Sequence, residues 1–222
     1  MNEQLAKWIR WITLIKEDVV NLATVRDVRR KFIEIVLNNP EINKDNLFYF
    51  YIDKTYYSFV LSSIRRHDKC KFGSASLLNL LKDIIDNPKI YALNEYDTED
   101  DIEYNRCGII DVPQYADETG TYLNIELVKI DLSELQDKIN NCCNYVDRRI
   151  AHLDPKGLTG GIKKPNEKEI DECVDIINAL FIKYNGILTR TTTNTVTYEV
   201  GNWKSIFTKP WVIEKKEVYK ND

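Results

Sequence analysis

The chain has 222 residues, of which 43% are hydrophobic and 30% are charged, and its formal net charge at pH 7 is −4. This length can bury a sizeable core, so we predict a single domain over residues 1–222 of a soluble globular class. The net negative charge argues against a broad nucleic-acid-binding coat, but it does not exclude a local basic groove.

The sequence carries no signal for a membrane or for a metal. It has no run of 18 apolar residues, and charged residues interrupt the first 20 residues as they would not in a signal peptide. The five cysteines include no C-x-x-C pair, and there are only two histidines, which argues against a zinc site. We therefore expect a cytoplasmic protein with reduced thiols, no metal and no cofactor.

The first three predicted helices cover residues 3–37, 45–67 and 74–87. Apolar residues recur at steps of three and four from Leu5 to Leu22, and a second set extends to the stop at 38–40, so 3–37 forms either two helices or one long bent helix. The aromatic residues of 45–67 are typical of a strand, but 20 residues without Gly or Pro favour a buried helix. Ser74 or Ser76 is expected to cap the third helix.

Two further helices follow a long connection. Residues 89–130 lose the helical period, and six of the nine residues from Glu95 to Glu103 are acidic, so we predict a long, partly ordered acidic connection. The next helix is predicted over 131–154, with Asp131 and Glu134 as a capping box, and the last over 166–189 with a second such box. The tail, 190–222, is expected to pack on the bundle. The fold class is all-α, a helical bundle of four to five main helices.

The stretch YVDRRIAHLD at 145–154 is the candidate for chemistry. At 100° per residue, Arg148 and His152 lie about 200° and 240° from Val146, so both occupy one polar flank, and Arg149 is within reach. Guanidinium groups bind phosphate oxygens, and nearby positive charge favours a neutral imidazole that accepts a proton. This combination suits RNA phosphodiester cleavage without a metal. The alternative is structural: the arginines offset the helix dipole and His152 caps a carbonyl.

Two other basic runs are candidates for solvated surface, and one of them has a second interpretation. Residues 65–71, RRHDKCK, either form one wall of an RNA groove, with Arg65 and Arg66 contacting phosphate, or a solvated helix end. Residues 26–31, RDVRRK, are interpreted as a plain solvated face.

The same stretch resembles the HEPN superfamily, and within it the abortive-infection (AbiU-like) branch of bacterial phage-defence and toxin–antitoxin proteins. In that branch a helix ends in Asn or Asp, Lys or Arg, two variable residues, Ala-His and often a further Asp. The matching positions here are Asp147, Arg148, Ala151, His152 and Asp154. SSIRR at 62–66 and WKSIFTKPW at 203–211 are also similar, so the resemblance covers most of the chain.

The resemblance implies a HEPN-like bundle and a metal-independent endoribonuclease that works as a homodimer, with His152 of both copies in a composite site. Its catalytic pattern is Arg, four to six residues, then His, and the positions that could supply this Arg are Tyr145, Val146 and Asp147. Arg148 or Arg149 substitutes for it, or an arginine of 65–66 does, or cleavage has been lost while binding is kept.

Two functions follow from these observations. In the first, His152 is the general acid or base of a ribonuclease acting as a toxin or defence effector, Arg148 and Arg149 complete the catalytic set, and Arg65, Arg66, Tyr145 and Asp147 line the substrate site. In the second, the chain is a catalytically inactive helical dimerisation module that binds RNA or a partner protein, such as an antitoxin.

Overall fold

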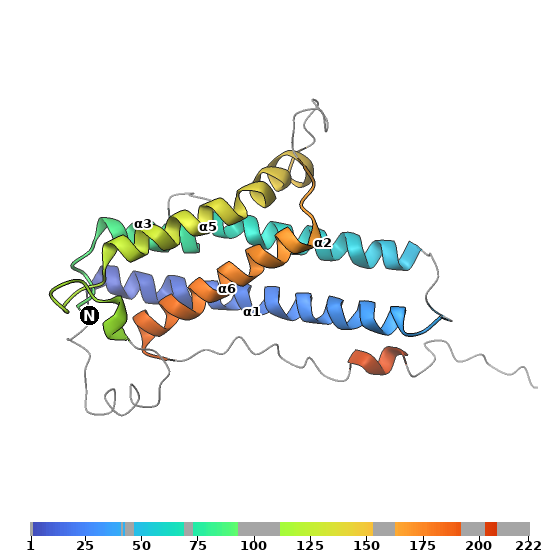
Figure 1. Ribbon diagram of the computed structural model, residues 1–222, viewed down its shortest axis with the longest axis horizontal. Coiled ribbons are helices and arrows are strands. Elements are labelled where there is room, and N and C mark those ends of the chain that lie inside the picture. The colour runs from blue at the N-terminus through green and yellow to red at the C-terminus, as the bar shows by residue number, and fades with distance from the viewer. Residues whose placement is uncertain are drawn as a thin grey trace, which may run out of the picture.

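The computed structural model describes residues 2–40, 42, 47–68, 73–92, 112–152, 163–191 and 203–207. Five α-helices pack against one another within these residues (Figure 1): α1 (Glu3–Leu37), α2 (Leu47–Asp68), α3 (Leu77–Asp86), α5 (Ile125–Tyr145) and α6 (Glu167–Thr189). Three short helical turns accompany them: η2 (Val112–Tyr115), η3 (Val146–Ile150) and η5 (Trp203–Phe207). This part of the chain contains no strand, only two isolated β-bridges, which confirms the predicted all-α bundle.

The first three helices agree with the sequence pattern. Residues 3–37 form one helix of 35 residues, and the aromatic segment predicted over 45–67 is the helix α2, not a strand. Ser76 caps α3, because its side chain accepts a hydrogen bond from the backbone N–H of Asn79 at 3.1 Å.

The prediction for α5 is wrong at both ends. The helix begins at Ile125, with Asn124 as its N-cap, so the expected capping box at Asp131 and Glu134 lies inside the helix. Asp131 instead accepts hydrogen bonds from Lys183 Nζ and Tyr184 Oη of α6, each at 2.6 Å. Local spacing could not reveal these partners, which lie more than 50 residues away. The capping box at the start of α6 is confirmed.

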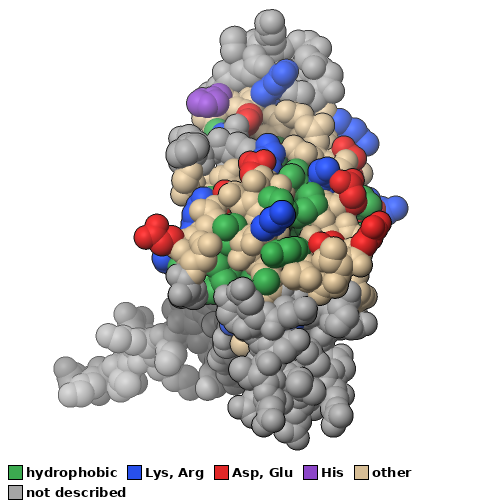
Figure 2. Space-filling view, turned by 90° about the vertical axis from the view of Figure 1, so that its left-hand side faces the viewer, with side chains coloured by type: hydrophobic (Ala, Val, Ile, Leu, Met, Phe, Trp, Pro, Cys, Tyr) green, Lys and Arg blue, Asp and Glu red, His purple; other side chains and the backbone are tan. Residues whose placement is uncertain are grey.

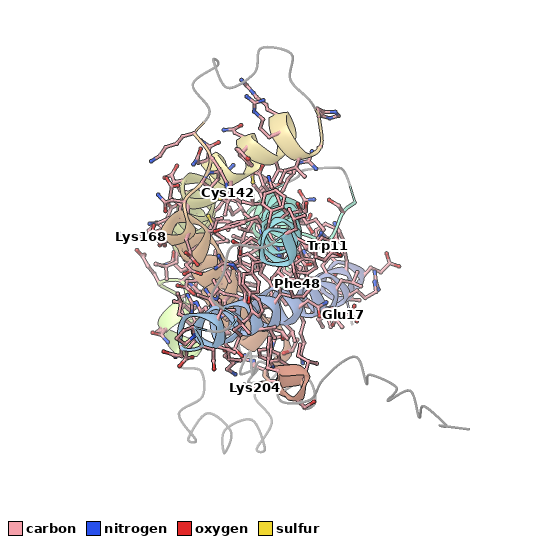
Figure 3. The ribbon with its side chains drawn as sticks, turned by 90° about the vertical axis from the view of Figure 1, so that its right-hand side faces the viewer. Trp11, Glu17, Phe48, Cys142, Lys168 and Lys204 are labelled. Atoms are coloured by element: carbon pink, nitrogen blue, oxygen red, sulfur yellow. The ribbon has the colours of Figure 1, made fainter. Side chains whose placement is uncertain are left out.

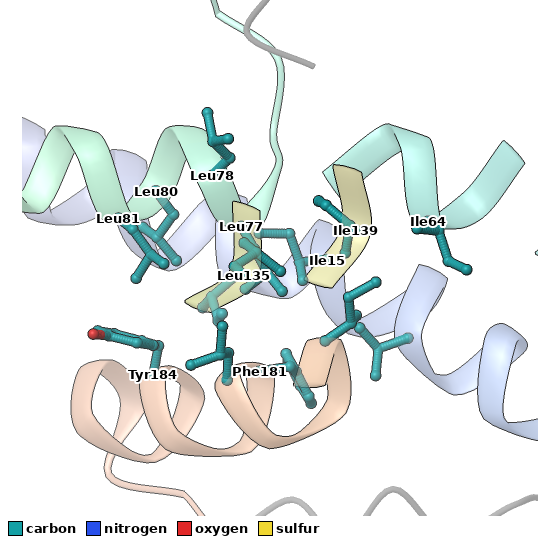
Figure 4. Close-up of a cluster of buried hydrophobic side chains, with 14 of the residues drawn as sticks. Ile15, Ile64, Leu77, Leu78, Leu80, Leu81, Leu135, Ile139, Phe181 and Tyr184 are labelled. Carbon is teal, nitrogen blue, oxygen red and sulfur yellow. The ribbon is translucent and has the colours of Figure 1, made fainter. Parts of the chain in front are cut away.

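The core draws on all five helices. Figure 4 shows leucines of α3 facing Leu135 and Ile139 of α5, with Phe181 and Tyr184 of α6 on the other side. α5 packs on α2, α3 and α6, while α1 packs on α6, α2 and α3. Hydrophobic burial is the main stabilising contribution here, since no single helix can cover its own apolar stripe.

Three cysteines are buried in this core as free thiols, and two of them face each other. Cys142 of α5 and Cys173 of α6 have their sulfur atoms 3.6 Å apart. The hydrogen bond with Cys142 and burial raise the pKa of the Cys173 thiol, and burial raises that of Cys143. The Cys143 and Cys173 thiols are therefore protonated and act as small apolar groups. Figure 3 views the bundle from one end, along its helices, and labels Cys142 among the side chains of the bundle.

The basic run at 26–31 is not a plain solvated face. Arg29 is 6% exposed and pairs with Asp53 of α2 at 3.2 Å and with Glu167 of α6. Its neighbour Arg26 pairs with Asp175 of α6 at 2.5 Å. These arginines thus hold α1 against α2 and α6. Their carboxylate partners lie on other helices, so the spacing of charges within residues 26–31 could not predict the pairs.

The tail contacts the bundle where the structure describes it. The ring of Phe207 in η5 lies 5.8 Å from Phe32 of α1, and Trp203 packs edge-on against Phe207. Figure 1 shows η5 beside the C-terminal half of α1. The expected packing of the tail is thus confirmed for 203–207, while Trp211 lies outside the described residues. None of the helices described here combines the length and apolarity needed to cross a bilayer.

Candidate functional site

The α-helical geometry of α5 ends at Tyr145 and changes into a π-helical turn, η3. The backbone N–H of Ala151 donates to the carbonyl of Val146, five residues earlier, at 2.8 Å. The prediction of an α-helix through residue 154 is therefore wrong, and the rotation of 100° per residue does not hold beyond Tyr145. A hydrogen bond that spans five residues is a common way for a helix to end, so η3 fixes the backbone at this end of α5 without itself marking a function.

An ion pair attaches the π-turn to α2. Arg65 Nε donates to Asp147 Oδ1, and the two side chains are 29% and 34% exposed. Val146 stays buried in the core beside it. The structure thus brings together two residues that the sequence placed in the site, and their ion pair holds η3 against α2.

The other polar side chains at the C-terminal end of α5 are either exposed to solvent or carry N–H groups without an acceptor. Figure 1 shows the end of α5 projecting past α2 and α6, and His152, just beyond η3, is exposed, as is Arg148. Arg149 is half-buried, and its Nε and Nη2 atoms are shielded from solvent with no hydrogen-bond partner in the described part of the chain. Figure 2 shows a histidine at the molecular surface, at an end of the molecule that also carries a Lys or Arg side chain.

The unsatisfied donors of Arg149 are the most informative feature of the site. A guanidinium is always charged, and its N–H groups form a planar fork that fits a phosphate or carboxylate. Burying such donors without an acceptor costs free energy, and a bound anion would relieve the cost. An anion at Arg149, three residues before an exposed imidazole, can meet Nε and Nη2 only where the groups that shield them move aside.

A second polar cluster holds the C-terminal end of α2 against α1. Asp18 of α1 accepts a hydrogen bond from Ser63 Oγ at 2.7 Å and pairs with Arg66, and His67 Nε2 lies 3.2 Å away without the alignment of a hydrogen bond. Burial alone would raise the pKa of Asp18, but His67, Arg66 and Ser63 outweigh it and hold this pKa well below its ordinary value.

This cluster changes the interpretation of the basic run at 65–71. His67 is 2% exposed and does not line an open groove, whereas Arg66 pairs with Asp18 and is still half exposed, and residues 69–72 lie outside the described part. Sequence reasoning missed Asp18 and Ser63, because their contact joins positions 45 residues apart and no local motif marks it.

Of the remaining predicted residues, one lies within the described part of the chain and one lies outside it. Tyr145 is partly buried and packs against the core just before η3. Asp154, the last residue of the family pattern, lies outside the described residues, as does the acidic run at 95–103. In the described ranges no group of three or more His, Cys, Asp or Glu side chains is arranged to hold a metal ion.

Comparisons with protein-family models, with curated proteins and with solved structures find no match for this chain.

Proposed function

We propose that the chain is a metal-independent endoribonuclease of the HEPN type, acting as a toxin or defence effector, with its site at the end of α5. The observation that carries the proposal is the helix end at η3, where the unsatisfied Arg149 donors come three residues before the exposed His152. It adds to the resemblance of residues 147–154, which points to the same reaction.

In the proposed reaction the 2′-hydroxyl of a ribose attacks the adjacent phosphorus and the 5′-oxygen of the next nucleotide leaves. His152 moves a proton as general base or general acid. Arg149, assisted by Arg148, holds the non-bridging oxygens as negative charge builds up in the transition state. Arg65 and Asp147 are positioning residues, since their ion pair holds η3 in place. The products are a 2′,3′-cyclic phosphate end and a free 5′-hydroxyl.

The test is cleavage of total RNA by the purified full chain in EDTA. The wild type should cleave, His152→Ala should not, and Arg149→Gln should lose most of the rate, about 100-fold or more by analogy with other charge-stabilising donors. Arg10→Gln is the matched control, since Arg10 is exposed on α1, and it should cleave like the wild type. Cleavage that survives in His152→Ala would refute the assignment.

The second candidate is an inactive dimerisation module that binds RNA or an antitoxin-like protein. The family's catalytic pattern places four to six residues between an arginine and the histidine. For His152 these arginine positions hold Tyr145, Val146 and Asp147, and this departure favours the inactive module. Growth on expression separates the two. Arrest by the wild type that is relieved in His152→Ala supports the enzyme, whereas a harmless wild type with no cleavage in EDTA supports the module.

A further inference from the structure

A hollow of about 410 Å³ lies between α1, α2 and η5. Its walls come from the C-terminal half of α1, the first half of α2 and the turn η5, and Figure 1 shows these segments side by side. None of the described residues that line it belongs to the candidate site, which lies at the other end of α2. A ligand in this hollow would therefore have a function separate from the proposed ribonuclease.

The hollow is lined mainly by aromatic rings. Seven aromatic side chains take part, and its described walls expose apolar atoms only. The rings of Phe32 in α1 and Phe207 in η5 lie 5.8 Å apart, and Trp203 stands edge-on to Phe207 at 6.2 Å. Water finds few hydrogen-bond partners in such a space, so replacing it by an apolar molecule is favourable.

Among the described residues of the lining only Arg29 is charged, and its charge is already balanced. Its N–H groups are directed to Asp53 at 3.2 Å and to Glu167. Its guanidinium also lies 4.6 Å from the ring centre of Tyr56, another residue of the lining. A charged ligand would therefore be buried here without a partner, which costs free energy.

The same contacts of Arg29 keep the hollow open. Because Arg29 pairs with carboxylates of both α2 and α6, it holds the separation of α1 from α2 beside the hollow. Val28 and Ile52 line the hollow without joining the core cluster, and Ile206 of η5, which also lines it, is 41% exposed. The site is thus largely pre-formed, as small-molecule sites usually are, and its wall can be altered without disturbing the core.

We infer that this hollow binds an uncharged aromatic molecule of about two or three rings. A dry cavity of about 150 Å³ is enough for one benzene ring, so a hollow of about 410 Å³ admits roughly two or three. The lining rings offer such a ligand offset and edge-to-face contacts, which stabilise aromatic pairs beyond the burial of their area. Trp203 and Phe207 would hold η5 against the ligand as well as against α1.

Fluorescence of N-phenyl-1-naphthylamine, an uncharged probe of this size, tests the inference on the purified full chain. Its emission should rise and saturate at one probe per chain, with a dissociation constant between about 1 and 100 μM. His152→Ala should bind the probe like the wild type, so the result does not depend on RNA cleavage. A wild type that shows no saturable rise would overturn the inference.

Two variants locate the bound probe. Val28→Trp should fill the hollow and raise the dissociation constant about 10-fold or more, whereas Leu14→Trp adds the same ring at an exposed position of α1 outside the hollow and should bind like the wild type. Ile52→Asn puts a polar group on the wall and should also weaken binding about 10-fold, with the exposed Ile130→Asn as its control. Binding that neither Val28→Trp nor Ile52→Asn weakens would place the probe elsewhere and overturn the inference.

Two matched ligands test the chemical class. The sulfonate of the same probe, 8-anilino-1-naphthalenesulfonate, should bind about 10-fold more weakly or worse, since the charge of Arg29 is already balanced by carboxylates. Phenanthrene should displace the probe at a lower concentration than 1-dodecanol, a flexible chain of similar size. Equal or tighter binding of the sulfonate, or stronger displacement by 1-dodecanol, would contradict an uncharged aromatic ligand.

Discussion

The Asp18 cluster offers a stability test whose size can be worked out from the contacts. In Asp18→Asn the side chain keeps its shape but loses its charge, so the buried Ser63 loses a charged acceptor, Arg66 loses its ion pair, and His67 loses the carboxylate 3.2 Å from its Nε2. Hydrogen bonds to charged groups contribute about 1.5–3 kcal/mol, and the half-exposed Arg66 adds about 1 kcal/mol or less. Since Asn can still accept from Ser63, we expect a net loss of about 2–3 kcal/mol.

The effect should depend on pH in a defined direction. The pKa of Asp18 is lowered in the folded chain, so its stabilisation is complete above the pKa of the unfolded chain and is lost as the pH falls toward the folded value. The difference between wild type and Asp18→Asn should thus be constant above about pH 5 and shrink below about pH 4.

Urea or thermal unfolding followed by circular dichroism measures this difference. For a chain of this length, 2–3 kcal/mol corresponds to a fall in Tm of about 4–12 °C. Asp27→Asn is the control, because Asp27 forms a surface pair with Lys31 on the same helix, and it should cost about 0.5 kcal/mol or less. A cost for Asp18→Asn below about 1 kcal/mol, or a difference unchanged down to about pH 3, would refute the reasoning.

Three further predictions concern the π-turn, the core and the thiols. Asp147→Asn should cost at most about 1 kcal/mol of stability, because its pair with Arg65 is partly exposed, yet it should slow RNA cleavage by freeing η3. The exposed Asp137→Asn is the control and should change neither stability nor cleavage, so an equal cleavage rate in both variants would contradict the positioning role. Leu135→Ala, at a fully buried position, should lower the free energy of unfolding by about 3 kcal/mol, whereas the exposed Leu14→Ala should cost less than about 0.5 kcal/mol, and similar costs would argue against the core. The three buried thiols should react with a thiol reagent only in guanidinium, leaving at most the other two of the five cysteines reactive in the native chain, and rapid reaction of more would contradict the burial.

The helices could be predicted because their signals are local. Apolar residues at steps of three and four marked the α1 stripe, and Ser76 and Asn166 marked helix starts through side chains that reach only a few residues along the chain. The start of α5 was missed because Asp131 and Glu134 have capping spacing but a different role, set by the contact of Asp131 with α6.

The residues of the candidate site come from the sequence, whereas its geometry comes only from the structure. The residue types of 147–152 suggested anion binding near an imidazole, whereas the π-turn depends on how Val146 and Asp147 meet the core and α2. The same limit applies to the arginines at 26–31, whose carboxylate partners come from other helices. Long-range ion pairs have no period in the sequence, so only the folded arrangement reveals them.

The chemistry of the RNA ends tests the central claim most directly. Fragments produced by the wild type in EDTA should carry 2′,3′-cyclic phosphate and 5′-hydroxyl ends, detectable by mass spectrometry, and His152→Ala should produce none above the level of a mock purification. Fragments with 5′-phosphate ends, or cyclic ends that persist in His152→Ala, would contradict a site built on His152 and the arginines of the π-turn.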